Sequence, residues 1–378
     1  MVEAATKPDY ILRPVTQSSL VSIIAPMLNE ARHIDRFVAD VADQDFAGDV
    51  EVIVADGGST DGSVERLEAA ARRRGLALTV LENPSSWVSQ GLNACINRAR
   101  GDLLVRLDCH SRYPSDYLRR CVLAAEEESD ALVVGGIIVA EGRTAMERAV
   151  ACAMDSPFGG IGFYRLYTDD GHLLKRLAGA VGLRSARNGH GARRADSDTT
   201  TFGAFRPEAF SRVGLFDESL RRNQDDEFNL RVRLAGGRIV VDPAIRVHYT
   251  PRGSLKGVFR QYHEYGLWKV PVMLKHGQLS SARSFAPLVF VSTLIALAPA
   301  AALSRAGRRV LAVELGAYAA LAFASGGISI RGRRESWSLL PRVVTVFPAF
   351  HTGYGIGMLR GWARAAALTS TLRRRRPG

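Results

Sequence analysis

The sequence predicts an α/β fold with a mainly parallel sheet, followed by a helical region that associates with a membrane. Residues 21–140 alternate short apolar runs with helical spacing, which is typical of strands that are buried on both faces and joined by helices. Residues 284–304 then contain no charged side chain over 21 positions, which is long enough for a helix to span a bilayer.

The expected strands are rich in Val, Ile and Leu. They cover residues 21–25, 50–56, 76–82, 101–108 and 131–139. The expected helices between them cover residues 30–43, 61–74, 88–99 and 114–128. A helix near 225–236 and two short strands, RIVVDP and RVHY, are expected later in the chain. Functional residues should follow the carboxyl ends of the strands, where sheets of this kind bind ligands.

Two other segments have a different character. Residues 156–203 hold many Gly, Arg, Asp and Ser residues and show little periodicity, so they are expected to form a long, mobile functional loop. Residues 254–270 are amphipathic, and their aromatic and basic side chains suit a membrane interface. An ordinary helix packed on the core is an equal alternative for this second segment.

The apolar C-terminal region is expected to supply two or three membrane spans. Residues 310–330 carry one charge, whereas residues 336–359 include Arg342, His351 and two prolines and form a weaker span. An even number of crossings keeps the first part of the chain and the arginine-rich tail in the cytosol, but it places the three arginines of residues 304–309 outside. A shallow hairpin avoids this, and the buried helices of a soluble protein are a further alternative.

Charge and cysteine content favour one kind of partner and one compartment. The 50 basic and 38 acidic residues give a formal charge of +12. Much of the excess flanks the apolar segments, which favours a membrane surface over nucleic acid. The first twenty residues lack the apolar core of a signal peptide, and the four cysteines form no CxxC pair, so a cytosolic location with reduced thiols is expected.

Two candidate ligand-binding segments follow the first two expected strands. Pro26 to Glu30 lie in APMLNE, and Asp56 ends the second strand, before the turn GGSTDGS. An acidic side chain at this position can accept hydrogen bonds from a uracil or a ribose, and Asp61 is positioned to cap the next helix. A plain strand–turn–helix connection fits the same residues. The phosphate-binding pattern GxxxxGK[ST] is absent, and no GxGxxG follows the first strand.

Two further candidate sites are acidic. Asp108 and His110 stand two residues apart at the end of the expected strand GDLLVRLD. A carboxylate and an imidazole so placed could bind a divalent cation and hence a diphosphate, although a structural turn is the alternative. The sequence QDDEF at residues 224–228 precedes an apolar-periodic helix. Three consecutive acids usually mark a solvated helix start favoured by the helix dipole, but one of them could be a general base.

The order of these motifs resembles that of the family 2 glycosyltransferases. The chain has PMLNE, VADGGSTDGS, a strand ending in Asp-Cys-His, and GLFDE followed by NQDDEFNLRVRLAGG, over about residues 20–250. The resemblance implies an inverting enzyme with the nucleotide-diphospho-sugar transferase fold called GT-A. The Asp-x-His form with its following tyrosine, the segment DTTTFGAFR and the apolar C-terminal region look most like the ExoA-like branch, the succinoglycan-type exopolysaccharide glucosyltransferases.

The resemblance implies roles for the residues that match the donor site of the family. The nucleoside of the donor would be held by Pro26, Asn29, Glu30 and Asp56. Asp108, with His110 in place of the usual second aspartate, would hold Mg²⁺ or Mn²⁺ and the diphosphate. His248 in RVHY would face the metal, and Arg252 is expected to contact phosphate, with a plain strand-end residue as the alternative for both.

The resemblance also implies a base and a type of product. Asp225 would be the catalytic base, although Gln224 replaces the glutamate that usually precedes it. The pattern QxxRW of the processive synthases is not matched by QYHEY at residues 261–265, so transfer of a single sugar is expected. The donor would be a nucleotide-sugar, with uridine favoured. The acceptor would be a lipid-linked saccharide or polysaccharide precursor at the cytoplasmic face of the inner membrane.

The expected domain organisation follows from these assignments. It consists of an N-terminal extension (1–19), a GT-A domain (20–253), an amphipathic interface segment (254–283), membrane helices (284–359) and a basic tail (360–378). A nucleotidyltransferase could share the sheet, but its Gly-rich, basic loop after the first strand is missing. A catalytically silent membrane protein that binds nucleotide-sugar or polyprenyl lipid is the alternative from another class. The retained Asp56, Asp108 and Asp225 argue against it.

Overall fold

The computed structural model describes residues 12–159, 194–277 and 282–374. The chain divides into two compact units, of which the first comprises residues 1–139 and 188–249 and the second residues 140–187 and 250–378. Residues 140–159, the described part of a segment that the sequence analysis includes in the GT-A domain, fall in the second unit. The expected domain bounds stay a prediction. Most of the loop expected at residues 156–203 lies outside the described residues.

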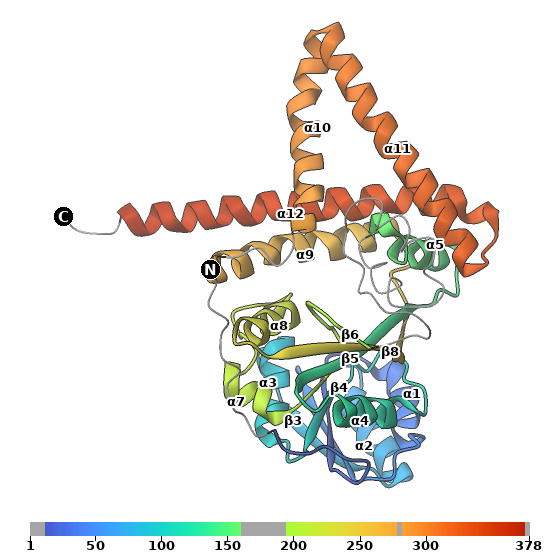
Figure 1. The fold of residues 1–378 in the computed structure, drawn as a ribbon, viewed down its shortest axis with the longest axis vertical. Helices are drawn as coiled ribbons and strands as arrows, with labels where there is room; N and C mark the ends of the chain where they lie inside the picture. The colour runs from blue at the N-terminus through green and yellow to red at the C-terminus, as the bar shows by residue number, and fades with distance from the viewer. Residues whose placement is uncertain (1–11, 160–193, 278–281, 375–378) are drawn as a thin grey trace. The chain divides into compact units, whose positions relative to one another are not determined.

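Within the described residues, the first unit forms an eight-stranded sheet in the order β3-β2-β1-β4-β7-β5-β8-β6 (Figure 1). The strands are β1 (Val21–Met27), β2 (Val50–Asp56), β3 (Ala77–Glu82), β4 (Leu103–Arg106), β5 (Ala131–Ala140), β6 (Ala195–Asp196), β7 (Gly203–Phe205) and β8 (Arg238–Tyr249). The helices are α1 (Ala31–Ala42), α2 (Ser63–Arg74), α3 (Val88–Arg98), α4 (Tyr117–Glu127), α7 (Pro207–Val213) and α8 (Gln224–Leu234). The α/β fold expected from the sequence is confirmed.

The sheet is parallel over the strands that the alternating pattern predicts. β1 pairs in parallel with β2 and β4, whereas β7 lies antiparallel between β4 and β5. The prediction of two short strands near residue 240 is wrong, because β8 continues through Pro243. The fixed φ of proline fits an extended backbone. The Asp242 carboxylate also accepts a hydrogen bond from the Ala244 N–H at 2.8 Å, which steadies the chain there.

Alternate residues of the strands supply two apolar cores, one on each face of the sheet. Val21 and Ile23 of β1 pack in the core that includes α1, α2 and α4. Ile24 packs in the other core, with Leu92 of α3 and Phe228 of α8. This alternation follows from the two-residue period of a strand and explains why the strands read as nearly continuous apolar runs. The four cysteines are buried free thiols, as expected.

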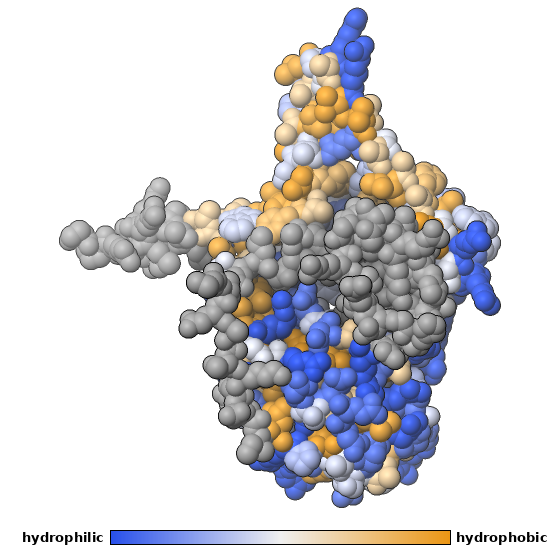
Figure 2. Space-filling model, viewed as in Figure 1, coloured by the Kyte–Doolittle hydropathy of each residue, from blue (hydrophilic) through white to orange (hydrophobic). Residues whose placement is uncertain are grey.

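The second unit is helical. Its main helices are α5 (Ala145–Met154), α9 (Leu255–His276), α10 (Ala286–Leu303), α11 (Arg305–Arg333) and α12 (Leu340–Arg374). Among the described helices, α10 and α11 are long and apolar enough to cross a membrane, by length and composition. Only 6% and 11% of the residues in their most apolar 18-residue windows are buried. Many hydrophobic side chains are therefore exposed on these helices, with hydrophilic ones between them (Figure 2). Two of the three expected spans correspond to these helices, and the weaker third one falls on α12.

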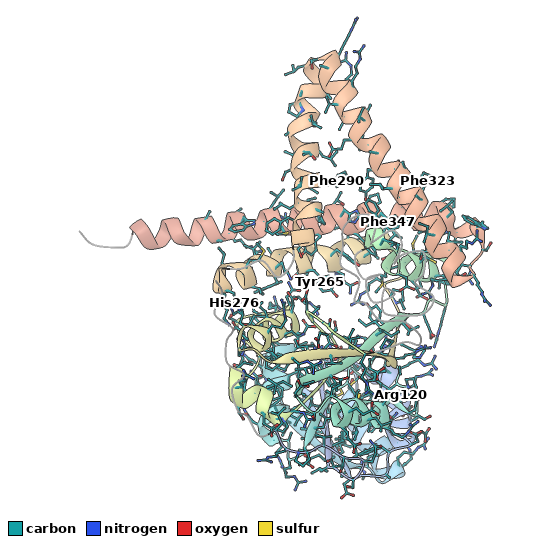
Figure 3. The ribbon with its side chains drawn as sticks, in the orientation of Figure 1. Arg120, Tyr265, His276, Phe290, Phe323 and Phe347 are labelled. Atoms are coloured by element: carbon teal, nitrogen blue, oxygen red, sulfur yellow. The ribbon has the colours of Figure 1, made fainter. Side chains whose placement is uncertain are left out.

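Aromatic side chains join α10, α11 and α12. Phe290 of α10 stacks on Tyr318 of α11 with ring centroids 4.4 Å apart. The Tyr318 hydroxyl lies 2.8 Å from Nδ1 of His351 on α12, and Nε2 of the same ring lies 2.9 Å from the Phe158 carbonyl oxygen. Phe347 packs edge-on against Phe158, and Figure 3 marks Phe290 and Phe347 on their helices. These contacts connect the hairpin of α10 and α11 to α12.

Helix α12 packs closely on α9 through glycines that are four residues apart. A Cβ atom added at Gly353 would lie 2.7 Å from the Phe259 carbonyl oxygen, and one at Gly357 would collide with that of His263. Four-residue spacing puts both glycines on one face of the helix, where small residues allow close helix–helix approach. The segment 254–270 is thus helical as expected, and its location at a membrane interface stays a prediction.

We expect Gly357→Ala to destabilise the second unit by about 1–3 kcal/mol, which is typical of overpacking, because its methyl group would collide with α9. The control is Gly316→Ala on α11, where an added Cβ meets nothing within 4 Å. That change should be neutral or stabilising by up to about 1 kcal/mol, since alanine favours a helix. Thermal unfolding of the purified protein in detergent compares the two. Equal unfolding midpoints would contradict close packing of α9 and α12.

Candidate active site

The candidate site lies where the carboxyl ends of β1 and β4 separate. The register of β1 with β4 ends at Ile24 and Arg106, whereas its register with β2 continues to Met27 and Asp56. The chain proceeds from β1 to β2 and β3 on one side, and then to β4 on the other. Sheets of this kind bind ligands at such a reversal of strand order. Pro26 lies in the last part of β1, beyond the pairing with β4, where a missing N–H costs no ladder hydrogen bond.

Side chains connect the β1–α1 loop to the β2–α2 loop. The Asn29 N–H donates to Ser59 Oγ at 2.8 Å, and Asn29 Oδ1 accepts from the Thr60 N–H at 2.9 Å. Asn29 has a φ of 54°, in the left-handed region that Asn adopts more readily than most residues. Asn29, predicted to hold the nucleoside, therefore also fixes the two loops that border the site.

Asp56 organises the turn that follows β2. Its Oδ2 accepts hydrogen bonds from the N–H groups of Gly58 and Ser59, at 3.0 and 2.9 Å, and its Oδ1 accepts from Ser59 Oγ at 2.6 Å. Gly58 has a φ of 83°, which suits glycine best. The carboxylate is thereby held at the edge of the sheet, where the sequence analysis places a nucleoside contact.

The prediction that Asp61 caps the following helix needs correction. The N-cap of α2 is Gly62, which has a left-handed backbone. Asp61 accepts hydrogen bonds from the N–H groups of Ser63 and Ala31, both at 3.1 Å. It thus joins the first turns of α1 and α2, and its two carboxylate oxygens satisfy N–H groups that the helices themselves leave unpaired.

Asp108 and His110 have different partners in this structure. Nδ1 of His110 lies 2.9 Å from Oε1 of Glu30, so a residue after β4 contacts a residue after β1 across the separated strand ends. His33 lies 3.9 Å from the other oxygen of Glu30. The Asp108 carboxylate is paired instead with Arg106, at 3.3 Å. The two predicted metal ligands thus lie on one loop, each with its own partner.

Arg106 contacts acidic side chains from two parts of the chain. Its Nε and Nη2 lie 3.3 Å from Oδ1 of Asp108, and its Nη1 lies 4.0 Å from Oδ2 of Asp225. The Arg106 side chain is 7% exposed, against 16% for Asp108 and 22% for Asp225. Burial lowers the pKa of Arg106, but the two carboxylates outweigh it and hold that pKa above its ordinary value. The guanidinium therefore stays charged.

Asp225 lies in the first turn of α8, which begins directly after Asn223 in a left-handed conformation. Its Oδ1 accepts a hydrogen bond from the Asp226 N–H at 2.9 Å. Burial raises the pKa of Asp225, the Arg106 cation opposes this, and the Asp226 carboxylate raises it further. Gln224, which replaces the glutamate of the family, is 6% exposed, so the structure buries its amide rather than presenting a second acid.

Glu227, the third acid of the QDDEF sequence and another candidate for the base, has a structural role. It is fully buried and binds Arg231, with oxygens 2.9 and 3.0 Å from Nε. Arg231 in turn donates to main-chain carbonyl oxygens of residues 213–215. This buried pair connects α8 to the segment after α7, and the Glu227 carboxylate is committed to it.

His248 lies near the end of β8, whereas Arg252 follows that strand. The backbone of His248 pairs with that of Arg112, with N–H···O distances of 2.9 and 3.0 Å. The end of β8 therefore lies beside the loop that carries Asp108 and His110. Arg252 belongs to the second unit, and its contact with phosphate stays a prediction.

Within the part of the chain that the structure describes, no group of three or more His, Cys, Asp or Glu side chains is arranged to hold a metal ion. This does not conflict with the predicted use of Mg²⁺ or Mn²⁺. Such ions are commonly held by one or two protein ligands, with substrate phosphates and waters completing their coordination. Asp108 and His110 offer a carboxylate and an imidazole on one loop, so the donor set fits this mode.

Two residues of the site, Arg106 and Tyr113, were not predicted from the sequence. The Tyr113 hydroxyl accepts a hydrogen bond from the Asp108 N–H at 2.7 Å, and Tyr113 is buried beneath the loop. Arg106 precedes Asp108 by two residues in a strand that is otherwise apolar. Residues two apart in an extended segment point to the same side. Arg106, a charged residue in an otherwise apolar strand, was therefore the signal that could have predicted its contact with Asp108.

Comparisons with known proteins identify the family of the chain. The profile of the family described as "Glycosyl transferase family 2" matches residues 22–150. The succinoglycan biosynthesis protein ExoA of Rhizobium meliloti (strain 1021) is 31% identical over 347 residues, which are 89% of this chain and 93% of that protein.

A second relative is more distant. The dolichyl N-acetyl-alpha-D-glucosaminyl phosphate 3-beta-D-2,3-diacetamido-2,3-dideoxy-beta-D-glucuronosyltransferase of Methanococcus voltae is 23% identical over 287 residues, covering 74% of this chain and 81% of that one.

Among solved structures, the mannosyltransferase PcManGT from Pyrobaculum calidifontis, in complex with GDP-Man and Mn²⁺, covers 98% of this chain and 92% of its own. The TM-score is 0.52 at 19% sequence identity, which supports a shared fold. The fold is therefore that of the GT-A glycosyltransferases, with apolar helices in the C-terminal region. From the match to residues 22–150 and the similarity to ExoA over most of its length, we conclude that the chain belongs to glycosyltransferase family 2.

Proposed function

We propose that this glycosyltransferase moves a single sugar from a nucleoside-diphosphate sugar to a lipid-linked or polysaccharide-precursor acceptor at the cytoplasmic face of the inner membrane. The observation that carries the proposal is the pair Asp108 and Asp225, whose carboxylates both face Arg106 at the carboxyl ends of the strands. We assign the Asp108 carboxylate to the donor side and the Asp225 carboxylate to the acceptor side. The exposed apolar helices α10 and α11 support a lipid-linked acceptor.

The relatives support the classes of donor and acceptor. The Methanococcus voltae enzyme is named for action on a dolichyl-linked sugar phosphate, and ExoA is named for succinoglycan biosynthesis. The Pyrobaculum calidifontis enzyme is described with a nucleoside-diphosphate sugar and Mn²⁺. For this chain we favour a uridine diphosphate sugar as the donor.

On the donor side, Asp56 would contact the nucleoside, while Pro26, Asn29 and Glu30 shape the adjoining loop. Asp108 and His110 would hold Mg²⁺ or Mn²⁺. His248 would contribute to the same site, because its backbone pairs with that of Arg112 in the same loop. A divalent ion so held supplies charge that neutralises the leaving diphosphate. Glu30 orients the His110 imidazole, as a hydrogen-bonded partner commonly does for a metal-binding histidine.

On the acceptor side, Asp225 would accept the proton of the acceptor hydroxyl. The hydroxyl oxygen then forms a bond to the anomeric carbon as the bond from that carbon to the diphosphate breaks on the opposite face. The anomeric configuration is therefore inverted. Burial raises the pKa of Asp225, which makes its carboxylate a stronger base than an exposed aspartate.

A donor screen tests the proposed function. Membranes that contain the protein are incubated with nucleoside-diphosphate sugars, a polyprenyl-linked saccharide and Mn²⁺, and release of nucleoside diphosphate is measured. We expect release with one donor that requires both the lipid acceptor and the metal, and that stops with excess chelator. Donor binding without release under every condition would favour the silent-binder alternative.

We expect Asp225→Asn to lower turnover by about 10²–10⁴-fold, the usual effect of removing a general base. Affinity for the donor should change little, because Asp56 and Asp108 supply its contacts. Asp226→Asn is the matched neighbouring change and should have a milder effect on turnover. The measurement is the initial rate at saturating donor and acceptor. Turnover of Asp225→Asn within a few-fold of the wild type would show that another group is the base.

The pH dependence of turnover should report the environment of Asp225. Because the base acts in its deprotonated form, turnover is lost as the pH falls through its pKa. Burial, and then the Asp226 carboxylate, raise that pKa, so the loss should begin above the ordinary range of an aspartate. Asp226→Asn removes one of these causes and should shift the acid limb of the kcat profile to lower pH. A shift to higher pH would contradict the assignment.

A further inference from the structure

Arg106 is a buried cation in a strand whose other residues are apolar. It is the last residue of β4, follows Leu103, Leu104 and Val105, and its side chain is 7% exposed. Burying a charged group costs free energy unless the group is paired and hydrogen-bonded. A leucine or valine would meet the packing needs of this strand, so the arginine calls for another explanation.

The guanidinium of Arg106 uses its two edges for different partners. Nε and Nη2 face Asp108, at 3.3 Å from Oδ1, and Nη2 is 3.4 Å from Oδ2. Nη1 faces the start of α8, at 4.0 Å from Oδ2 of Asp225, and lies 3.5 Å from the Thr201 carbonyl oxygen. The planar fork of arginine has donors in both directions, which the single ammonium group of lysine lacks.

The segment before β7 closes over the same guanidinium. Its central carbon lies 5.9 Å from the centre of the Phe202 ring, close enough for a favourable cation–π contact. Phe202 itself is buried and packs edge-on against Tyr113, whose hydroxyl binds the Asp108 backbone. Arg106 is therefore fixed by neighbours on several sides, while the two carboxylates that it contacts stay partly exposed.

The two carboxylates come from distant parts of the sequence and carry like charges. Asp108 lies in the loop after β4, two residues beyond Arg106, whereas Asp225 lies in the first turn of α8. Without a cation between them, their mutual repulsion would alter their spacing. A transfer reaction needs the leaving group and the base at fixed positions, and misplacement by about 1 Å can cost on the order of 10²-fold in rate.

We propose that Arg106 is a positioning residue that holds the donor-side carboxylate of Asp108 and the acceptor-side carboxylate of Asp225 in a fixed relation. It contacts neither substrate and acts through the two aspartates. This inference rests on the proposed function and adds to it a residue outside the motifs that identify the family.

Arg206 provides a matched control. It is a second buried arginine of the same unit, 2% exposed, and its hydrogen bonds go to the carbonyl oxygens of Ala131 at 3.0 Å, Arg13 at 2.6 Å, and Ala125. Replacing Arg206 removes a buried guanidinium without touching either aspartate. The variants are Arg106→Lys and Arg106→Met, compared with Arg206→Lys and Arg206→Met.

We expect Arg106→Lys and Arg206→Lys to lower the unfolding temperature by similar amounts. The same holds for the two methionine variants. Only the Arg106 variants should lower turnover per folded molecule, by about tenfold for lysine and about 10²-fold for methionine, the scale expected of a misplaced catalytic group. The lysine variants keep the charge and allow the comparison if methionine prevents folding. Equal turnover per folded molecule for Arg106→Lys and Arg206→Lys would overturn the proposal.

A double-mutant cycle separates positioning from a general loss of structure. In the Asp225→Asn background, Arg106→Met should lower turnover at saturating donor by less than it does in the wild-type background, because one of the two groups through which it acts is gone. A second cycle measures binding of UDP or GDP, whichever the wild type binds, in the presence of Mn²⁺. Arg106→Met should weaken this binding by about tenfold when Asp108 is present and little in the Asp108→Asn background.

Additive effects in both cycles would show that Arg106 only supports the fold. These outcomes differ from failure of the proposed function. If the wild type transfers no sugar from any donor, the proposed function fails, and the nucleotide-binding cycle alone then decides the role of Arg106 through its coupling to Asp108. If the wild type transfers sugar and both cycles are additive, only the inference about Arg106 fails.

Discussion

One buried cation lies between the two carboxylates on which the proposed chemistry depends. Arg106 contacts Asp108, from the loop after β4, and Asp225, from the first turn of α8. Since a buried guanidinium must be paired, and two nearby carboxylates repel each other, these three groups constrain one another. The segment that leads into β7 and the start of α8 must therefore approach the end of β4, and this forms the wall of the candidate site that carries Asp225.

The order of the strands explains why the other candidate residues gather at the same edge. β1 and β4 separate after Ile24, and the loops that follow them are joined by the contact between Glu30 and His110. Asn29 connects the first of these loops to the turn that Asp56 organises. The three loops are thus connected to one another by side-chain hydrogen bonds. The second unit has a different character, because its helices α10 and α11 expose apolar surface that suits a lipid environment.

Much of the first unit could be predicted because its signals are local. Apolar runs between helical patterns located the first five strands, and the acids after them located Asp56 and Asp108 at the sheet edge. The position of Asp225 at a helix start was predicted, and its proximity to Arg106 was not, because that contact depends on how α8 packs. The pairing of β7 between β4 and β5, and the role of Asp61 at two helices, likewise depend on contacts between distant segments. The expected roles of the site residues came from resemblance to a family. The hydrogen-bond and ion-pair partners of Asn29, Asp56, Asp108, His110 and Asp225 came from the structure.

The stereochemistry of the product shows whether the transfer proceeds by inversion, as the proposed role of Asp225 requires. If Asp225 activates the acceptor hydroxyl while the diphosphate leaves from the opposite face, each transfer inverts the anomeric carbon. The measurement is the proton NMR spectrum of the newly formed lipid-linked saccharide, made with the donor that the protein uses, in which the coupling of the anomeric proton reports its configuration. The account predicts a configuration opposite to that of the donor. A product that retains the configuration of the donor would contradict it, because retention requires a different arrangement of groups around the anomeric carbon.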